Sequence, residues 1–423
     1  MRIWLLLLLL LFPSISPAFS VLTHEAIIDA AWDQAIKPLL LKRFPQATPE
    51  DLEKAHAYSY GGCIIQDLGY YPFGSHQFSD LAHYVRSGTF VTNLVKDAGN
   101  LNELAFSLGA LAHYAADNQG HPIATNPSVG LLFPKLAQQY GPVVTYEDDP
   151  TAHVRTEFSF DVLQVARGHY APKAYHDFIG FEVSKELLDR AFQETYGIQM
   201  KDVFHNEDRS LGTYRHTVSS LIPEMTRVAW AIKKKDLLKE SPGLGRRKFV
   251  YNLKRSSYEK EWGAGYEKPS AKERFVAFLL RIVPKIGPFK ALAFKAPTRQ
   301  SEALFMKSFN ATLDQYRTLL AATSQDQLVL ADSNFDTGKP VVAGTYRLAD
   351  EAYAKLVDEL EHNKFAGMQA DLKDNILSFY QDVKAPTNPK QSPQDWEKLQ
   401  RELQELRAAP VSPAPQPAKV AAR

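Results

Sequence analysis

The chain has 423 residues, of which 45% are hydrophobic and 23% charged, a globular composition that excludes disorder along its whole length. Its 49 Lys and Arg residues nearly equal its 48 Asp and Glu residues, so charge indicates no nucleic-acid partner and we expect no stable nucleic-acid complex. The only cysteine, Cys63, permits no internal disulfide, and we interpret it as a buried thiol.

The first 18 residues have the pattern of an export signal. Arg2 precedes the apolar run Ile3–Phe12, and Ser16 and Ala18 form a small-x-small cleavage pattern. The run has ten residues, fewer than the about 20 that span a bilayer. The sequence therefore predicts a signal peptide over residues 1–18, cleavage between Ala18 and Phe19, and a secreted or periplasmic mature chain.

Beyond this segment, apolar residues recur at helical spacing, which predicts an all-α fold. The segments with this pattern, several of them opened by a Thr N-cap, are 23–36, 48–60, 100–117, 151–168, 171–197 and 220–235. Alternation typical of strands is rare, and residues 339–348 are the best candidate.

The composition changes along the second half of the chain. Residues 236–270 are basic and rich in loop formers, which predicts a linker after a first domain over residues 19–235. A helical C-terminal region is expected over residues 271–407, and a disordered Pro/Ala-rich tail over 408–423. The apolar, basic segment 271–297 favours a buried helix pair, with peripheral contact to a membrane surface as the alternative.

Side chains that bind metals are spaced at helical intervals. His113, Asp117 and His121 are four residues apart, which places them on one side of a helix. Pro122 disfavours helix at His121, so the helix should end near Gly120 and free His121 to reach a second metal ion. A lone pair of this kind is typical of a polar helix face, but this chain has several.

Four further candidates lie elsewhere in the first half. His153 and Glu157 repeat the four-residue spacing, and Asp67 and His83 bracket a loop rich in aromatic residues. His76 is an alternative to His83, which we favour because residues 81–84 continue a helix. With His24 at the start of the first mature helix, this set of His, Asp and Glu residues predicts a zinc centre.

Together, these residues resemble the zinc-dependent phospholipase C family, whose all-helical fold is shared with the single-strand-specific zinc nucleases. The similarity covers roughly residues 19–230 and implies a phospholipase C-like catalytic domain over 19–235 with three Zn²⁺ ions. It implies a first site of Asp67, His83, His113 and Asp117, a second of His121, His153 and Glu157, and a third of Phe19, His24 and Asp117, where Phe19 binds through its amino nitrogen and carbonyl oxygen.

The chain departs from the family pattern in two places. Relatives generally begin with Trp where this chain would begin with Phe19, which is compatible with binding through backbone atoms. The interval between Asp117 and His121 is shorter than in relatives, which weakens the placing of His121 in the second site.

The resemblance implies a secreted zinc-dependent phosphodiester hydrolase that cleaves a phospholipid with a metal-activated water, with Asp67 as the catalytic residue. Tyr70, Tyr71 and Phe73 could form a cation–π wall for a head group or could simply pack the loop. The same aromatic residues suit a nuclease that stacks a base. A third hypothesis is a secreted zinc-binding protein without catalytic activity. Protein partners are not indicated by the sequence.

Overall fold

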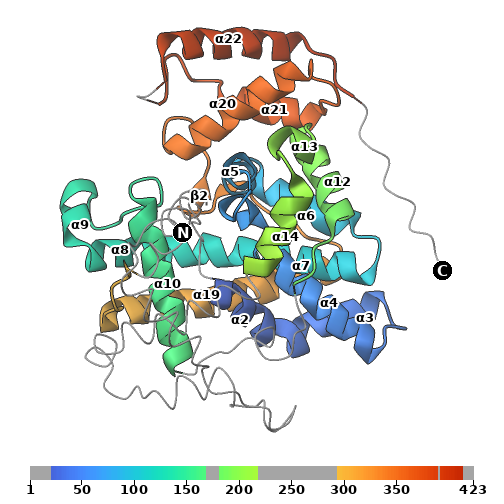
Figure 1. Ribbon diagram of the computed structural model, residues 1–423. Coiled ribbons are helices and arrows are strands. Elements are labelled where there is room, and N and C mark those ends of the chain that lie inside the picture. The colour runs from blue at the N-terminus through green and yellow to red at the C-terminus, as the bar shows by residue number, and fades with distance from the viewer. Residues whose placement is uncertain (1–20, 168–180, 218–292, 389–390, 413–423) are drawn as a thin grey trace, which may run out of the picture.

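A computed structural model describes residues 21–167, 181–217, 293–388 and 391–412 (Figure 1). The predicted signal peptide, Phe19, the helix at 220–235 and the linker at 236–270 lie outside the described residues, as do most of the segment 271–297 and of the C-terminal tail. Within the described ranges, no helix combines the length and the apolar character needed to cross a membrane.

The first part of the chain is built from helices, which confirms the all-α prediction. Helix α7, Leu101–Gly120, runs through its middle (Figure 1). The other elements are α2 (Val21–Ala31), η1 (Trp32–Ile36), α3 (Lys37–Arg43), α4 (Pro49–Gly62), η2 (Ile65–Tyr70), α5 (His76–Tyr84), α6 (Ser87–Asp97), η3 (His121–Thr125), α8 (Asn126–Leu132), α9 (Pro134–Tyr140), α10 (Pro150–Arg167), α12 (Lys185–Tyr196), α13 (Met200–Val203) and α14 (Glu207–His216).

Local signals in the sequence account for several of these helix ends. Thr48 caps α4 through a capping box with Asp51, and Pro49 occupies the first helical position. Helix α7 ends at Gly120, where the sequence predicts its end, but His121 keeps a helical backbone although Pro122 follows it. The chain does not leave the helical path there, because His121–Thr125 form one π-helical turn, η3, that continues into α8.

Close packing of α4 against α7 positions the site. A Cβ atom at Gly109 would lie 2.2 Å from the Ser59 carbonyl oxygen, so a side chain at this position would force the helices apart. Cys63, directly after α4, is fully buried and lies 3.2 Å from the Tyr60 carbonyl oxygen through its sulfur. This confirms the interpretation of Cys63 as a buried thiol.

The described residues of the second part of the chain form helices and one short hairpin, which we call the 333–340 hairpin. Only two residues of the segment expected as a strand, Lys339–Pro340, pair as β2, antiparallel to β1 (Ser333–Asn334). The strand prediction over 339–348 is otherwise wrong, because α20 begins at Arg347. The helices within the described residues of this part are α19 (Arg299–Ser324), α20 (Arg347–His362), α21 (Ala370–Phe379) and α22 (Pro393–Ala408).

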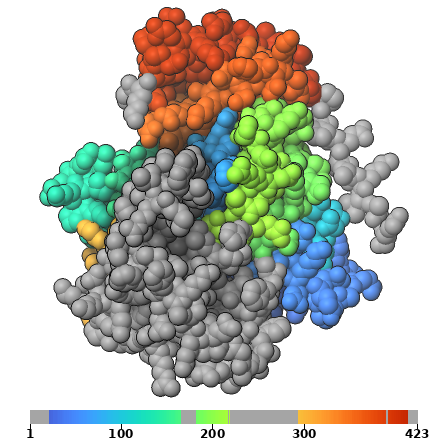
Figure 2. Space-filling model, in the orientation of Figure 1, coloured from blue at the N-terminus to red at the C-terminus, as the bar shows by residue number. Residues whose placement is uncertain are grey.

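The two parts share one hydrophobic core, which extends from Val21 to Ala409. Helix α19 packs along α7, and its Tyr316 hydroxyl donates a hydrogen bond to the Leu108 carbonyl oxygen at 2.8 Å. Helices α20–α22, orange to red in Figure 2, gather at one end of the molecule, where α20 packs against α5. The second part therefore reaches the elements that carry the candidate site.

Candidate metal centre

Four buried side chains from three elements meet beside the middle of α7. The two helical positions His113 and Asp117 come from α7, Asp67 from η2 and His83 from α5. The His83 Nε2 atom lies 3.3 Å from Asp67 Oδ1 and 3.4 Å from Asp117 Oδ2. The His113 Nε2 atom lies 3.1 Å from the same Asp117 oxygen and 3.4 Å from His83 Nε2. The structure thus brings together the whole set that the resemblance assigns to a first zinc ion.

Backbone carbonyl groups orient both imidazoles of this set. The Nδ1 atom of His83 donates to the Ser79 carbonyl oxygen at 2.7 Å, and Nδ1 of His113 donates to the Cys63 carbonyl oxygen at 3.0 Å. Because a neutral imidazole carries one proton, these bonds leave Nε2 of each ring as an acceptor. Both acceptors point toward the carboxylates, where a metal ligand would have to point.

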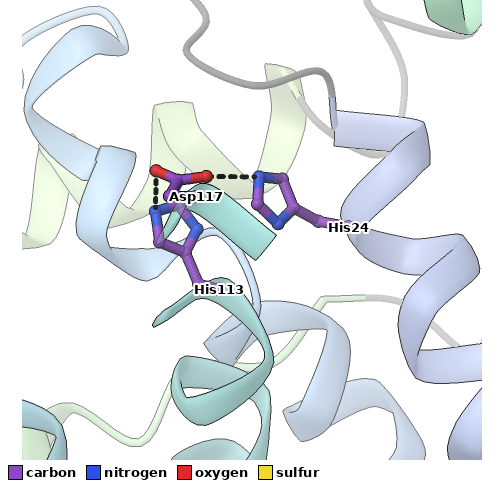
Figure 3. Close-up of side chains that lie close together, drawn as sticks. All are labelled: His24, His113 and Asp117. Atoms are coloured by element: carbon purple, nitrogen blue, oxygen red, sulfur yellow. Dashed lines mark ion pairs between the residues drawn. The ribbon is translucent and has the colours of Figure 1, made fainter. Parts of the chain in front are cut away.

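Asp117 also connects this set to helix α2. Its second oxygen, Oδ1, lies 3.6 Å from Nε2 of His24, as Figure 3 shows, while Oδ2 faces His113. The His24 and His113 rings stack with their centroids 4.5 Å apart. Asp117 Oδ1 is also 3.8 Å from Nε2 of His121. One carboxylate therefore lies among four histidines, counting His83.

A second set forms where η3 meets α10. His153 and Glu157 lie one turn apart on α10, and the Nε2 atoms of His121 and His153 are 3.1 and 2.9 Å from Glu157 Oε1. The two imidazole rings are perpendicular, with centroids 4.9 Å apart. The structure therefore brings His121 to Glu157 despite the short interval after Asp117.

Burial and mutual contacts shift the pKa values of the first set. Burial alone would lower the pKa of His83, but contacts with the Asp117 and Asp67 carboxylates raise it to about 10. Burial opposes ionisation of Asp117, yet the neighbouring His113 helps to hold the pKa of this carboxyl well below its usual range. Without metal, protons on imidazoles balance the buried carboxylates.

The second set and His24 differ because burial dominates. Burial raises the pKa of Glu157 to about 8, against the lowering effect of His121. Burial also lowers the pKa of His153, and burial together with His113 lowers that of His24 well below the usual value. The lowered pKa values keep His153 and His24 as neutral imidazoles, which is the form that binds a metal, whereas Glu157 has to lose its proton and a nearby cation would favour that loss.

The donor set fits zinc. Both carboxylate oxygens of Asp67, Asp117 and Glu157 are buried and accept no hydrogen bond. In the described part of the chain, the ion-pair partners of these three carboxylates are all histidines. Imidazole nitrogens and carboxylate oxygens are the ligands of catalytic zinc sites, and buried charges without a partner are otherwise costly.

Two other predicted residues have different outcomes. Phe19 lies outside the described residues, so its place beside His24 stays a prediction. His76 is exposed at the start of α5, its ring 5.5 Å from that of Tyr70, whereas His83 is buried among the carboxylates. The structure thus places His83, and not His76, beside the carboxylates, and its role as a ligand stays a prediction.

The aromatic residues of the loop after Asp67 divide between the site and the packing. The Tyr70 ring lies 6.0 Å from His83 and 5.9 Å from Tyr146. The Tyr71 ring packs edge-on against Tyr214, and the Arg209 guanidinium lies 3.6 Å above the centre of the Phe73 ring. The ring of Tyr70 thus lies beside a candidate ligand, whereas Phe73 packs against Arg209.

Sequence reasoning missed two residues of the 333–340 hairpin. Asp336 is buried, and its Oδ1 atom lies 3.5 Å from Nδ1 of His121 and 4.0 Å from Nδ1 of His153. Phe335 is fully buried, with its ring 5.3 Å from that of His83. His121, His153 and Asp336 form one of the buried groups able to hold a metal ion. No local motif marks Asp336, because it lies far from the histidines in sequence.

Residues 23–206 match the family model described as zinc dependent phospholipase C, which confirms the resemblance over that segment. Neither the curated proteins nor the solved structures include a match to this chain. The matched segment contains every described residue that the resemblance assigns to zinc, and it ends well before the 333–340 hairpin. The match and the buried clusters together support a zinc-dependent hydrolase.

Proposed function

Because residues 23–206 match the zinc-dependent phospholipase C family, we propose that the chain hydrolyses phosphodiesters, with a phospholipid as the substrate and three zinc ions at the site. The observation that carries this proposal is the position of Asp117, whose two oxygens face His24 on one side and His113 on the other (Figure 3). A carboxylate in that position is suited to hold two metal ions at once.

Bound zinc would supply a Lewis acid that activates water and withdraws charge from the phosphodiester. The residues of the first ion would be Asp67, His83, His113 and Asp117, those of the second His121, His153 and Glu157, and those of the third His24, Asp117 and the Phe19 backbone. Asp67 is the candidate catalytic residue: its Oδ1 atom faces His83 at 3.3 Å, and its Oδ2 atom, buried without a hydrogen bond, is the oxygen that would hold a water proton.

The reaction then needs little further chemistry from the protein. Asp67 orients a water molecule and accepts its proton while the water oxygen forms a bond to phosphorus. The bond between phosphorus and the alcohol oxygen breaks, the departing alkoxide takes a proton from a second water molecule, and Asp67 releases its proton to the resulting hydroxide. The products are a diacylglycerol and a phosphorylated head group. Tyr70, beside His83, is the aromatic residue placed to contact the substrate.

The third set of ligands leads to a proposal on export. His24 lies in the first turn of α2, fully buried and stacked on His113. If export removes residues 1–18, the new amino group at Phe19 lies five residues before His24 in the chain and completes the third site. The mature protein would then be secreted or periplasmic, with a phospholipid surface as its place of action.

The test compares Asp117→Asn with the native chain after signal-peptide removal. Three readouts are needed: zinc per chain, release of a phosphorylated head group from phospholipid vesicles, and cleavage of single-stranded DNA. We expect about three zinc ions and head-group release for the native chain, and for Asp117→Asn less zinc and activity at background. Retained activity in Asp117→Asn would overturn the assignment, and DNA cleavage alone would favour a nuclease.

A matched control separates the loss of a ligand from the loss of a buried carboxylate. Asp350, on α20, is also buried and accepts a hydrogen bond from the Gly344 backbone nitrogen at 2.9 Å, away from the site. Asp350→Asn keeps an acceptor oxygen for that bond, so its zinc content and activity should equal those of the native chain. Zinc binding without any turnover of either substrate would instead identify a zinc-binding protein that is not an enzyme.

A further inference from the structure

The 333–340 hairpin lies behind both sets of candidate ligands, although it is outside the segment that matches the family. The Phe335 backbone nitrogen donates to the His83 carbonyl oxygen at 3.1 Å, and the Phe335 ring lies 6.1 Å from that of His113. The next residue, Asp336, faces His121 and His153. Consecutive residues of one hairpin thus contact the first set of ligands and the second.

Asp336 and Glu157 lie at opposite nitrogens of the same two imidazoles. Glu157 Oε1 faces Nε2 of His121 at 3.1 Å and Nε2 of His153 at 2.9 Å. Asp336 Oδ1 faces Nδ1 of these rings at 3.5 and 4.0 Å. The rings are therefore held between two carboxylates. Glu157 faces the Nε2 atom of His121 that also lies near Asp117, whereas Asp336 faces the opposite nitrogen.

Residues outside the hairpin hold the Asp336 carboxylate in place. Its Oδ2 atom accepts hydrogen bonds from the Tyr146 backbone nitrogen and the Tyr346 hydroxyl, both at 2.8 Å. The Asn126 side chain donates to the Asp336 carbonyl oxygen at 2.8 Å, and Asn334 accepts from the Asp336 backbone nitrogen at 2.9 Å. Oδ1 alone has no hydrogen-bond donor and is the oxygen that faces the imidazoles.

The first set of ligands shows what an oxygen at Nδ1 does in this protein. There, the carbonyl oxygens of Ser79 and Cys63 accept from Nδ1 of His83 and His113, which leaves Nε2 as the metal-facing nitrogen. No such carbonyl bond is present at His153 in the described structure, where the Asp336 oxygen is the group beside Nδ1. Asp336 Oδ1 thus faces Nδ1 in the second set as the carbonyl oxygens do in the first, but at the longer distances of 3.5 and 4.0 Å.

We propose that Asp336 is a positioning residue of the zinc centre: it accepts Nδ1–H of His121 and His153 and so presents their Nε2 atoms to the metal together with Glu157. This inference rests on the proposed function, because it requires zinc at the second set. A carboxylate or carbonyl behind a zinc-bound imidazole fixes the tautomer and strengthens the ligand. The C-terminal part of the chain is then a component of the metal centre.

The alternative role for Asp336 is that of a ligand, with the metal on the Nδ1 side of both rings. The geometry favours positioning for two reasons. The Glu157 oxygen is closer to both Nε2 atoms than the Asp336 oxygen is to both Nδ1 atoms. Asp336 Oδ2 is already used by two donors, which leaves one oxygen for any other partner.

The first experiment uses the native mature chain, loaded with zinc and labelled with ¹⁵N at histidine. Nitrogen shifts distinguish a protonated from a metal-bound ring nitrogen. We expect His121 and His153 to carry a proton on Nδ1 and to bind zinc through Nε2. Metal-bound Nδ1 at either residue overturns the proposal, and this measurement does not depend on any variant folding.

The second experiment measures zinc affinity by chelator competition, together with zinc per chain. Asp336→Asn should keep the native number of zinc ions but bind one of them about 10- to 100-fold more weakly, the usual loss for such outer groups. Loss of one ion altogether would make Asp336 a ligand, and unchanged affinity would make it irrelevant to the metal. A native chain that binds no zinc would refute the proposed function instead, so the two failures are distinguishable.

Asn126→Ala is the matched control for the hairpin itself. It removes the bond to the Asp336 carbonyl oxygen and loosens the hairpin, but leaves the Asp336 carboxylate in place. Its zinc affinity should stay within about 3-fold of the native value, well short of the loss expected for an outer group. A loss in Asn126→Ala as large as that in Asp336→Asn would overturn the proposal, since it would trace the effect to general loosening.

Discussion

Two regions of the molecule meet at the candidate metal centre, and they contribute in different ways. Helices α7 and α10 supply candidate ligands at four-residue spacing, such as His113 with Asp117 and His153 with Glu157. The 333–340 hairpin supplies side chains that pack against those ligands or face them. Asp336 is in a hairpin, so it is not one of a pair of residues spaced four apart on a helix.

The difference lies in the origin of the geometry. One turn of helix places two ligands within reach of a common ion, so their relation is local and needs only helix formation. The place of the hairpin depends on the docking of the whole second part of the chain, through α19 on α7 and α20 on α5. We therefore expect zinc removal to destabilise the ligand helices and the hairpin together, and to affect α21 and α22 little.

Zinc removal should have the largest effect and test this division directly. Chelation leaves the carboxylates of Asp67, Asp117 and Glu157 buried without a metal, so the free energy of unfolding should fall by about 4 kcal/mol for each site previously occupied at a thousand times its dissociation constant. Hydrogen exchange should then speed up in α7, in α10 and in the 333–340 hairpin, but not in α22.

Adding zinc back should restore the slow exchange, and adding magnesium, which prefers oxygen ligands, should not. If the hairpin exchanged at the same rate with and without zinc while α7 responded, the two regions would be energetically separate. That result would show that the hairpin is not coupled to the metal, even if the centre bound zinc as proposed.

The same contrast explains what the sequence could predict. Helical periodicity predicted the all-α fold, and Thr48 with Pro49 marked the start of α4 because both signals act within one turn. The cluster of His83, His113 and Asp117 was predictable through the family resemblance, which carries the long-range part of the information.

What the sequence could not predict depends on contacts between distant residues. Asp336 is one aspartate in a turn, and only the docked hairpin brings it to His121, so no spacing rule reveals it. Pro122 predicts the end of an α-helix, but not that the chain would continue through a π-helical turn that carries His121 toward Glu157. Both depend on packing that is decided outside the local segment.

Gly109→Val should have the next largest effect, because it separates two helices beneath the ligands. The added Cβ would meet the Ser59 carbonyl oxygen at 2.2 Å and the Cys63 backbone nitrogen at 2.8 Å, and both are backbone atoms that cannot move aside. We expect a loss of about 3 kcal/mol or more in the free energy of unfolding, measured with urea.

Gly212→Ala is the control for the glycine itself. Gly212 lies in α14 with open space where a Cβ would be, so alanine should stabilise the helix by up to about 1 kcal/mol. A Gly109→Val protein as stable as the native chain would mean that α4 does not pack on α7 as described.

Gly338→Ala perturbs the hairpin. It should lower the free energy of unfolding by less than Gly109→Val does, but it should weaken zinc binding more. Gly338 has a φ of +65°, and a Cβ there would lie 2.9 Å from the Asn118 carbonyl oxygen, one residue after Asp117. The left-handed conformation costs an alanine about 1 to 2 kcal/mol, and the close approach displaces the hairpin from α7. Zinc affinity should therefore fall, as measured by chelator competition.

Gly367→Ala isolates the conformational part of that cost. Gly367 has a φ of +79° with nothing near a Cβ, and it lies between α20 and α21. This variant should lose about the same 1 to 2 kcal/mol with no change in zinc affinity. Equal zinc affinities in the two variants would show that the hairpin does not support the ligands.

The smallest effect should come from an ion pair that ties the two parts together through residues that are not candidate ligands. Arg86 is buried, donates to the Thr195 carbonyl oxygen at 3.1 Å and pairs with Asp371 on α21, whereas the Arg43–Asp326 pair is exposed on both sides. Asp371→Asn should cost about 1 kcal/mol in urea unfolding, because it leaves a buried guanidinium less well paired.

Asp326→Asn should cost at most about 0.5 kcal/mol, as exposed pairs do. Neither variant should change zinc affinity. A change in Asp371→Asn would mean that the docking of α21, and not the hairpin alone, supports the metal centre.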